Sequence, residues 1–89
     1  MERADLKLLI LELIKRREEE LVRVGTDTIA LKLGRSPAEV RHALEQMERD
    51  GWVEHIRALS AEDPQTASWY WRLTDEGRRR LALARGEAA

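Results

Sequence analysis

Two helical patterns meet within the stretch Leu33-Gly34-Arg35-Ser36-Pro37-Ala38-Glu39-Val40. Gly34 can adopt the left-handed backbone conformation that ends a helix, and Pro37 is favoured at the first position of the next one. Ser36 and Glu39 have the spacing of a capping box, in which the serine hydroxyl accepts from the glutamate N–H and the glutamate reaches back to the serine N–H. One helix therefore ends and another begins with three residues between them.

The segments on either side of this junction predict a short helix followed by a longer one. The short helix begins at Thr26 or Asp27, either of which can cap it, and its apolar side consists of Ile29, Ala30 and Leu33. The longer helix covers residues 36–50, stops at Asp50-Gly51, and has an apolar stripe made of Val40, Ala43, Leu44 and Met47. Two helices joined by so short a turn are typical of the helix-turn-helix motif.

A further helical pattern precedes this motif, between Ala4 and Glu19. Its apolar positions recur at three- and four-residue steps, and one face consists of Leu6, Leu9, Ile10, Leu13 and Ile14. Leu8 and Leu11 fall on the opposite side, so either another element of the chain or a partner subunit is expected to cover them. The alternation in Leu21-Val22-Arg23-Val24 then predicts a very short strand.

The period of the pattern changes after Gly51 and predicts a β-hairpin. Residues 52–57 and 68–73 are expected to form strands, and Ala61-Glu62-Asp63-Pro64-Gln65 between them is expected to form a loop, because proline interrupts a strand ladder. The alternating side chains on one face of the second strand are Trp69, Trp71 and Leu73. We interpret Trp52 and Trp71 as core residues, and Trp69 as partly exposed or in an interface.

A last helix follows the hairpin. Thr74 caps it, it runs to Arg85, and Leu81 and Ala84 are expected to face inward. The predicted fold class is mainly α with a small β-hairpin (α+β), in a single domain over residues 1–89 that is structured over residues 4–85.

The composition excludes several classes of protein. The 89 residues include no cysteine and two histidines, so disulfides and thiolate metal sites are excluded, and we expect neither a metal nor a cofactor. No catalytic constellation is present, which predicts a protein that is not an enzyme. With 16 basic and 17 acidic residues, the net charge of −1 excludes a strongly basic protein but leaves room for a local basic face.

The same sequence predicts location and assembly. The longest apolar runs, such as Leu8–Leu11, have four residues and are far too short to span a bilayer. No secretory segment follows the charged start, so we expect a cytoplasmic protein. A domain of this size buries a modest core, and a partner subunit is an obvious support for it. We therefore expect a homodimer that uses Leu8 and Leu11, the last helix, or both.

The order helix, short strand, helix, helix, hairpin, helix resembles the winged helix-turn-helix superfamily. The segment 28–44 looks like its positioning and recognition helices, and Gln46-Met47-Glu48-Arg49-Asp50-Gly51-Trp52-Val53 looks like its usual helix exit. Tyr70-Trp71-Arg72-Leu73-Thr74-Asp75-Glu76-Gly77-Arg78 is similar to the strand-to-helix junction of PadR- and MarR-type transcriptional repressors. The resemblance implies sequence-directed binding of double-stranded DNA, usually by a homodimer.

The resemblance places the helix over residues 36–50 in the major groove. The candidate contacts that it implies there are Ser36, Pro37, Ala38, Arg41, His42, Glu45 and Arg49. Among them, Arg41 has the chemistry to bind guanine O6 and N7 through two parallel hydrogen bonds. The candidate contacts to the DNA backbone are Arg35, Arg57, Arg72, Arg78 and Arg79.

Each of these features has a simpler interpretation. The outward side of residues 36–50 and the run Arg78-Arg79-Arg80 are alternatively solvated helix faces, with Arg78 or Arg79 paired to Asp75. The acidic residues 62–63 at the hairpin tip depart from the basic wing expected for minor-groove contacts. The alternative function is a winged-helix module that binds another protein, which the near-neutral charge and the acidic tip favour.

Overall fold

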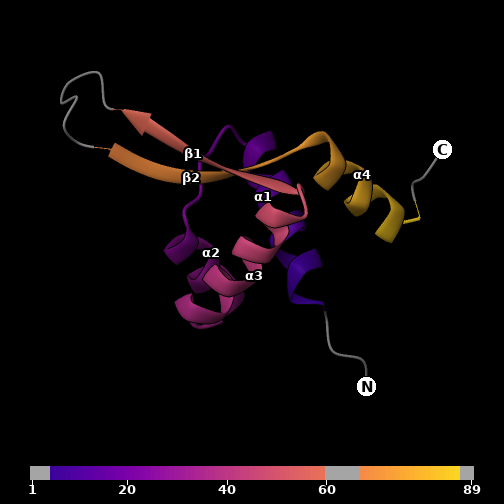
Figure 1. Cartoon of the computed structure of the whole chain (residues 1–89), viewed down its shortest axis with the longest axis horizontal. Coiled ribbons are helices and arrows are strands. Elements are labelled where there is room, and N and C mark those ends of the chain that lie inside the picture. The colour runs from indigo at the N-terminus through magenta and orange to yellow at the C-terminus, as the bar shows by residue number, and fades with distance from the viewer. Residues whose placement is uncertain (1–4, 60–66, 87–89) are drawn as a thin grey trace.

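The computed structural model describes residues 5–59 and 67–86 and follows the predicted order of elements (Figure 1). The elements are α1 (Leu6–Glu19), α2 (Thr26–Leu33), α3 (Pro37–Arg49), β1 (Val53–Leu59), β2 (Ala67–Leu73) and α4 (Asp75–Ala84). The winged helix-turn-helix architecture and the α+β class are confirmed. None of the helices in these two ranges is long and apolar enough to cross a membrane.

Side-chain caps explain where three of the helices begin. Asp5 accepts from the backbone N–H of Lys7 at the start of α1, and Thr74 accepts from Gly77 N–H at the start of α4. Ser36 accepts from Glu39 N–H at 3.2 Å, as predicted. The return contact differs from the prediction, because Glu39 accepts from the hydroxyl of Ser36 instead of its N–H.

The predicted cap of α2 is wrong. Gly25 occupies the cap position, and no side chain there bonds to the helix. The hydroxyl oxygen of Thr26 instead accepts a hydrogen bond from the indole nitrogen of Trp71. The end of α2 is as expected, because Gly34 adopts the left-handed conformation with φ 65°.

The two strands form an antiparallel hairpin in which His55 pairs with Trp71 and Arg57 with Trp69. The predicted strand at residues 21–24 is reduced to one bridging residue, since Val24 alone pairs with Trp71. Leu21 sits in a turn with φ 60°, which is incompatible with a strand. The predicted loop at residues 61–65, with its acidic tip, lies outside the described residues.

The core lies where α1, α2 and α3 pack together at the base of the hairpin, with α4 against α1 (Figure 1). The whole predicted stripe of α3 is buried, as are Trp71, Leu73 and Leu81. Trp52 is partly buried and packs on the edge of this core. Ala84 is exposed, contrary to the prediction, because Leu81 is the last side chain of α4 to reach the core.

The second leucine stripe of α1 is covered by the chain itself. Leu11 is 0% exposed, and Leu8 is partly buried against the core. Leu11 therefore presents no exposed surface in the single chain, and the dimer interface expected at Leu8 and Leu11 stays a prediction. The sequence allowed cover by another element of the chain or by a partner subunit, and for Leu11 the chain itself supplies the cover.

Candidate nucleic-acid interface

The outward face of α3 is open to solvent along its whole length. Its apolar stripe points into the core, which leaves on the surface Ser36, Pro37, Ala38, Arg41, His42, Glu45 and Arg49. Gln46 is half-buried, and its amide nitrogen lies 3.3 Å from Nε2 of His42 in a hydrogen bond. All seven residues predicted from the sequence for this face are thus accessible to a ligand.

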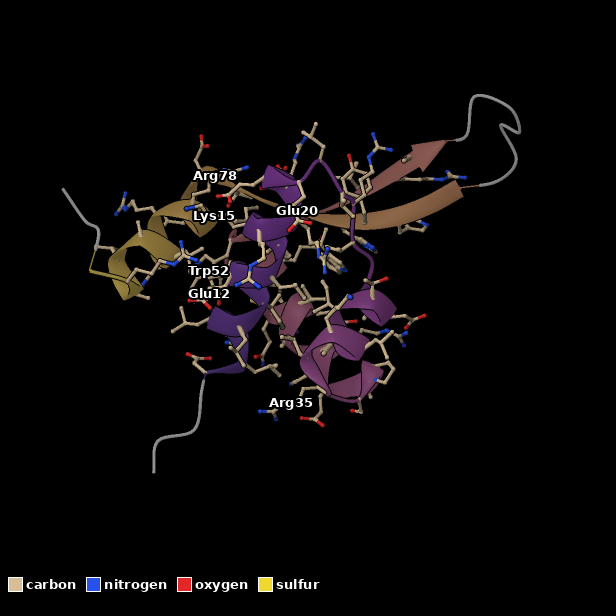
Figure 2. All side chains as sticks on the ribbon, turned by 180° about the vertical axis from the view of Figure 1, so that it is seen from behind. Glu12, Lys15, Glu20, Arg35, Trp52 and Arg78 are labelled. Atoms are coloured by element: carbon tan, nitrogen blue, oxygen red, sulfur yellow. The ribbon has the colours of Figure 1, made fainter. Side chains whose placement is uncertain are left out.

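Most of the predicted DNA-backbone arginines are paired with carboxylates. Their ion pairs are Arg35–Glu39 at 3.5 Å, Arg72–Glu54 at 2.7 Å, Arg78–Glu18 at 3.0 Å and Arg79–Glu76 at 3.8 Å. The hydrogen bonds that Arg72 donates to the Glu54 carboxylate raise the pKa of Arg72 above its ordinary value. The expected partner Asp75 is not used by Arg78 or Arg79. Figure 2 shows Arg78 of α4 beside α1, well away from Arg35.

A different set of arginines lacks such partners. Arg23, Arg41, Arg49 and Arg57 form no ion pair with any carboxylate in residues 5–59 and 67–86. Arg23 lies over the ring of Tyr70 and Arg57 over that of Trp69. These four guanidinium groups are therefore free of contact ion pairs, and on α3 they lie among Glu45 and Glu48, which also form none in the described residues.

A cleft lies between α2, α3 and the hairpin, and we call it the wing cleft. Its volume is about 660 Å³, and its lining residues are Arg23, Gly25, Thr26, Asp27, Thr28, Arg41, His55, Trp69 and Tyr70. It joins the outward face of α3 to the strands through Arg41. Sequence reasoning did not assign Arg23, His55 or Trp69 to this site. The alternation of the two strands places His55 and Trp69 on one face, but their register was needed to bring them together.

A second, more apolar groove lies between α1 and α4. Its lining includes Leu8, Leu11, Trp52 and Leu83, and Leu83 is 50% exposed. Lys7 and Arg80 place their cationic groups over the ring of Trp52, which lies between the two helices (Figure 2). This groove shares no lining residue with the wing cleft.

Together, the helix pair and the hairpin beside it define a winged helix-turn-helix fold. No protein-family model and no curated protein matches the chain. Among solved structures, an S. aureus MepR variant bound to an oligodeoxyribonucleotide is similar over 93% of this chain and 56% of its own, with a TM-score of 0.72 and 18% identity.

Two further solved structures have the same architecture. A variant of ZitR from Lactococcus lactis is similar over 98% of this chain and 53% of its own, with a TM-score of 0.68 and 20% identity. The adhesin competence repressor AdcR from Streptococcus pyogenes is similar over 93% of this chain and 55% of its own, with a TM-score of 0.69 and 17% identity. The chain thus spans a little over half the length of these proteins, and at such identities the likeness shows the fold alone.

Proposed function

We propose that this domain binds double-stranded DNA in a sequence-directed manner, as part of a transcriptional regulator that places α3 in the major groove. The observation that carries the proposal is the exposed face of α3, on which Arg41 and Arg49 have no carboxylate partner among the described residues. A guanidinium free of ion pairs is available for the two parallel hydrogen bonds to guanine that give base discrimination. The oligodeoxyribonucleotide bound to the MepR variant supports this use of the fold.

In this arrangement the residues of α3 differ in role. Arg41 and His42 lie in its first half, where a recognition helix meets base edges, so we assign the base contacts to them. Ser36 and Pro37 begin the helix and approach the phosphates beside it. The carboxylate of Glu45 is repelled by phosphate and is suited to accept a hydrogen bond from a cytosine amino group. Arg49 lies one turn further on and extends the same face.

The test is a selection of duplexes from a random pool, followed by titration of wild type and Arg41→Ala on the selected site and on a scrambled one. We expect Arg41→Ala to lose about 1–3 kcal/mol on the selected site and to relax the preference at one base position. Lys32→Ala on α2 removes one exposed cation elsewhere and serves as the matched control. If wild type binds no duplex even at low salt, the DNA proposal fails and the protein-interaction alternative, which the net charge of −1 favours, replaces it.

We further propose that the domain acts as a homodimer in the cytoplasm, where it meets DNA. Two copies related by a two-fold axis read two half-sites one helical turn apart, which a single α3 cannot do. With Leu11 buried, the surface that supports self-association is the α1–α4 groove, where Leu83 is half-exposed beside Leu8. None of the residues that line this groove belongs to α3, so its use leaves Arg41 and His42 accessible.

A further inference from the structure

We propose that the wing cleft seats the sugar–phosphate backbone of the bound duplex, with His55, Trp69 and Arg23 as contacts that act on any DNA sequence. The inference rests on the proposed function, since it names a second contact surface for the same duplex. The contacts to the DNA backbone are then assigned to the cleft between α2 and the strands, and not to Arg72 and Arg78, which are paired with carboxylates.

One wall of the cleft is a rigid aromatic stack. The ring of His55 lies parallel to that of Trp71, with centroids 4.1 Å apart and an interplanar angle of 7°, and 4.7 Å from the ring of Trp69. Trp71 is buried and bonded to Thr26, so it holds the stack in place. Trp69 is 52% exposed at the outer end and carries Arg57 over its ring. A fixed surface of this kind loses little conformational entropy when it binds.

The charge of the cleft suits a phosphodiester. Two guanidinium groups line it, from Arg23 and Arg41, and neither forms an ion pair with a carboxylate in the part of the chain that the structure describes. Asp27 is the acidic residue among the lining side chains. Arginine, histidine and threonine side chains are ordinary donors to phosphate oxygens. The flat, apolar face of the Trp69 ring offers a surface on which a deoxyribose can pack.

The position of the cleft favours the backbone over the bases. Arg41 belongs both to the outward face of α3 and to the cleft, so a strand whose bases meet α3 continues past Arg41 toward His55 and Trp69. The bases of a duplex stay stacked in its interior, and in this proposal α3 already occupies the major groove, where their edges are accessible. What reaches the strands is therefore phosphate and sugar, which carry no sequence information.

The experiment compares the full chain with Trp69→Ala, His55→Gln and Arg23→Gln on the selected and the scrambled duplex at two salt concentrations. We expect each variant to weaken binding to both duplexes by the same factor, about three- to tenfold, and Arg23→Gln to flatten the salt dependence by about one unit. Arg16→Gln removes an exposed α1 cation that also lacks a carboxylate partner in the described ranges, so it controls for net charge. Asp27→Asn should strengthen binding to both duplexes, a gain that damaged folding cannot produce.

Tryptophan fluorescence supplies an independent readout. Duplex should protect wild-type fluorescence from iodide quenching, Trp69→Phe should abolish this protection, and Trp52→Phe, which changes the far groove, should retain it. Wild type could bind duplex without protecting Trp69 from iodide, while the cleft variants bind as Arg16→Gln does. That result would overturn the proposed role of the cleft and leave the proposed function standing. Tighter binding of the single strands than of the duplex would also overturn it, because Trp69 would then stack on unpaired bases. Absence of any duplex binding would overturn the proposed function and the cleft together.

Discussion

The indole nitrogen of Trp71 donates a hydrogen bond of 3.0 Å to the hydroxyl of Thr26, which ties the middle of β2 to the first residue of α2. The backbone of Trp71 makes a second tie, since its N–H donates to Val24 O at 2.8 Å. These two bonds attach the hairpin to the helix-turn-helix pair. They lie beside the wing cleft, because Thr26 and His55, which stacks on Trp71, both line it.

Thr26→Val should destabilise the fold by about 1–3 kcal/mol, because it leaves the buried indole donor of Trp71 without a partner. Urea unfolding measures the change. Thr28→Val, two residues further along α2 at an exposed side chain, should change stability by less than about 0.5 kcal/mol. Equal effects from the two substitutions would contradict a structural role for the Trp71–Thr26 bond.

Glu18→Ala should cost about 1–3 kcal/mol, since one carboxylate joins three elements. Its Oε1 accepts from Leu73 N–H at 3.1 Å, and its Oε2 pairs with Arg78 at 3.0 Å. Glu19→Ala removes the neighbouring, exposed carboxylate and should be nearly neutral in the same thermal unfolding measurement. If Glu19→Ala loses as much stability as Glu18→Ala, the effect comes from the charge of the helix and not from the bonds of Glu18.

Gly77→Ala should destabilise the domain by about 1–3 kcal/mol, although alanine is the better helix former. A methyl group there would overlap the backbone carbonyl of Trp52, which cannot move away as a flexible side chain can. Arg79→Ala on the exposed side of the same helix is the control for helix propensity. Calorimetry that finds Gly77→Ala more stable than wild type would show that α4 can move away from Trp52.

Ser36→Ala should lose about 1 kcal/mol, because it removes the acceptor for Glu39 N–H at the start of α3. In a domain of this size that lowers the melting temperature by about 4–8 °C. Ser36→Asp keeps an acceptor at the same position and should recover most of the loss. An unchanged melting temperature for Ser36→Ala would place the start of α3 elsewhere.

Leu83→Glu should convert a dimer to a monomer in sedimentation velocity, because it places a charge in the apolar groove between α1 and α4. Leu31→Glu is the matched control, since Leu31 is 80% exposed on α2 and does not line that groove. Dissociation by Leu31→Glu but not by Leu83→Glu would move the interface to α2. A wild type that sediments as a monomer at all concentrations would end the dimer proposal.

Local signals in the sequence determined most of the fold. The Ser36 cap, the left-handed Gly34 and the apolar stripe of α3 each depend on residues within a few positions of one another, so spacing alone reveals them. The change from helical to alternating period after Gly51 likewise predicts the hairpin from neighbouring residues. The exposed face of α3 follows directly, because it is the side opposite the stripe.

Tertiary packing decided what those faces meet. Periodicity shows that Leu11 lies opposite the main stripe of α1, but only the packing of the chain against that side buries it. Sequence spacing gives Arg78 a neighbour in Asp75, whereas the folded chain brings it to Glu18 of α1. The wing cleft depends on the same kind of contact, because Arg23, Arg41 and Trp69 belong to three separate segments. Pairings of this kind depend on how whole elements dock, and the free energy that selects one docking is spread over the entire core and not encoded at the paired positions.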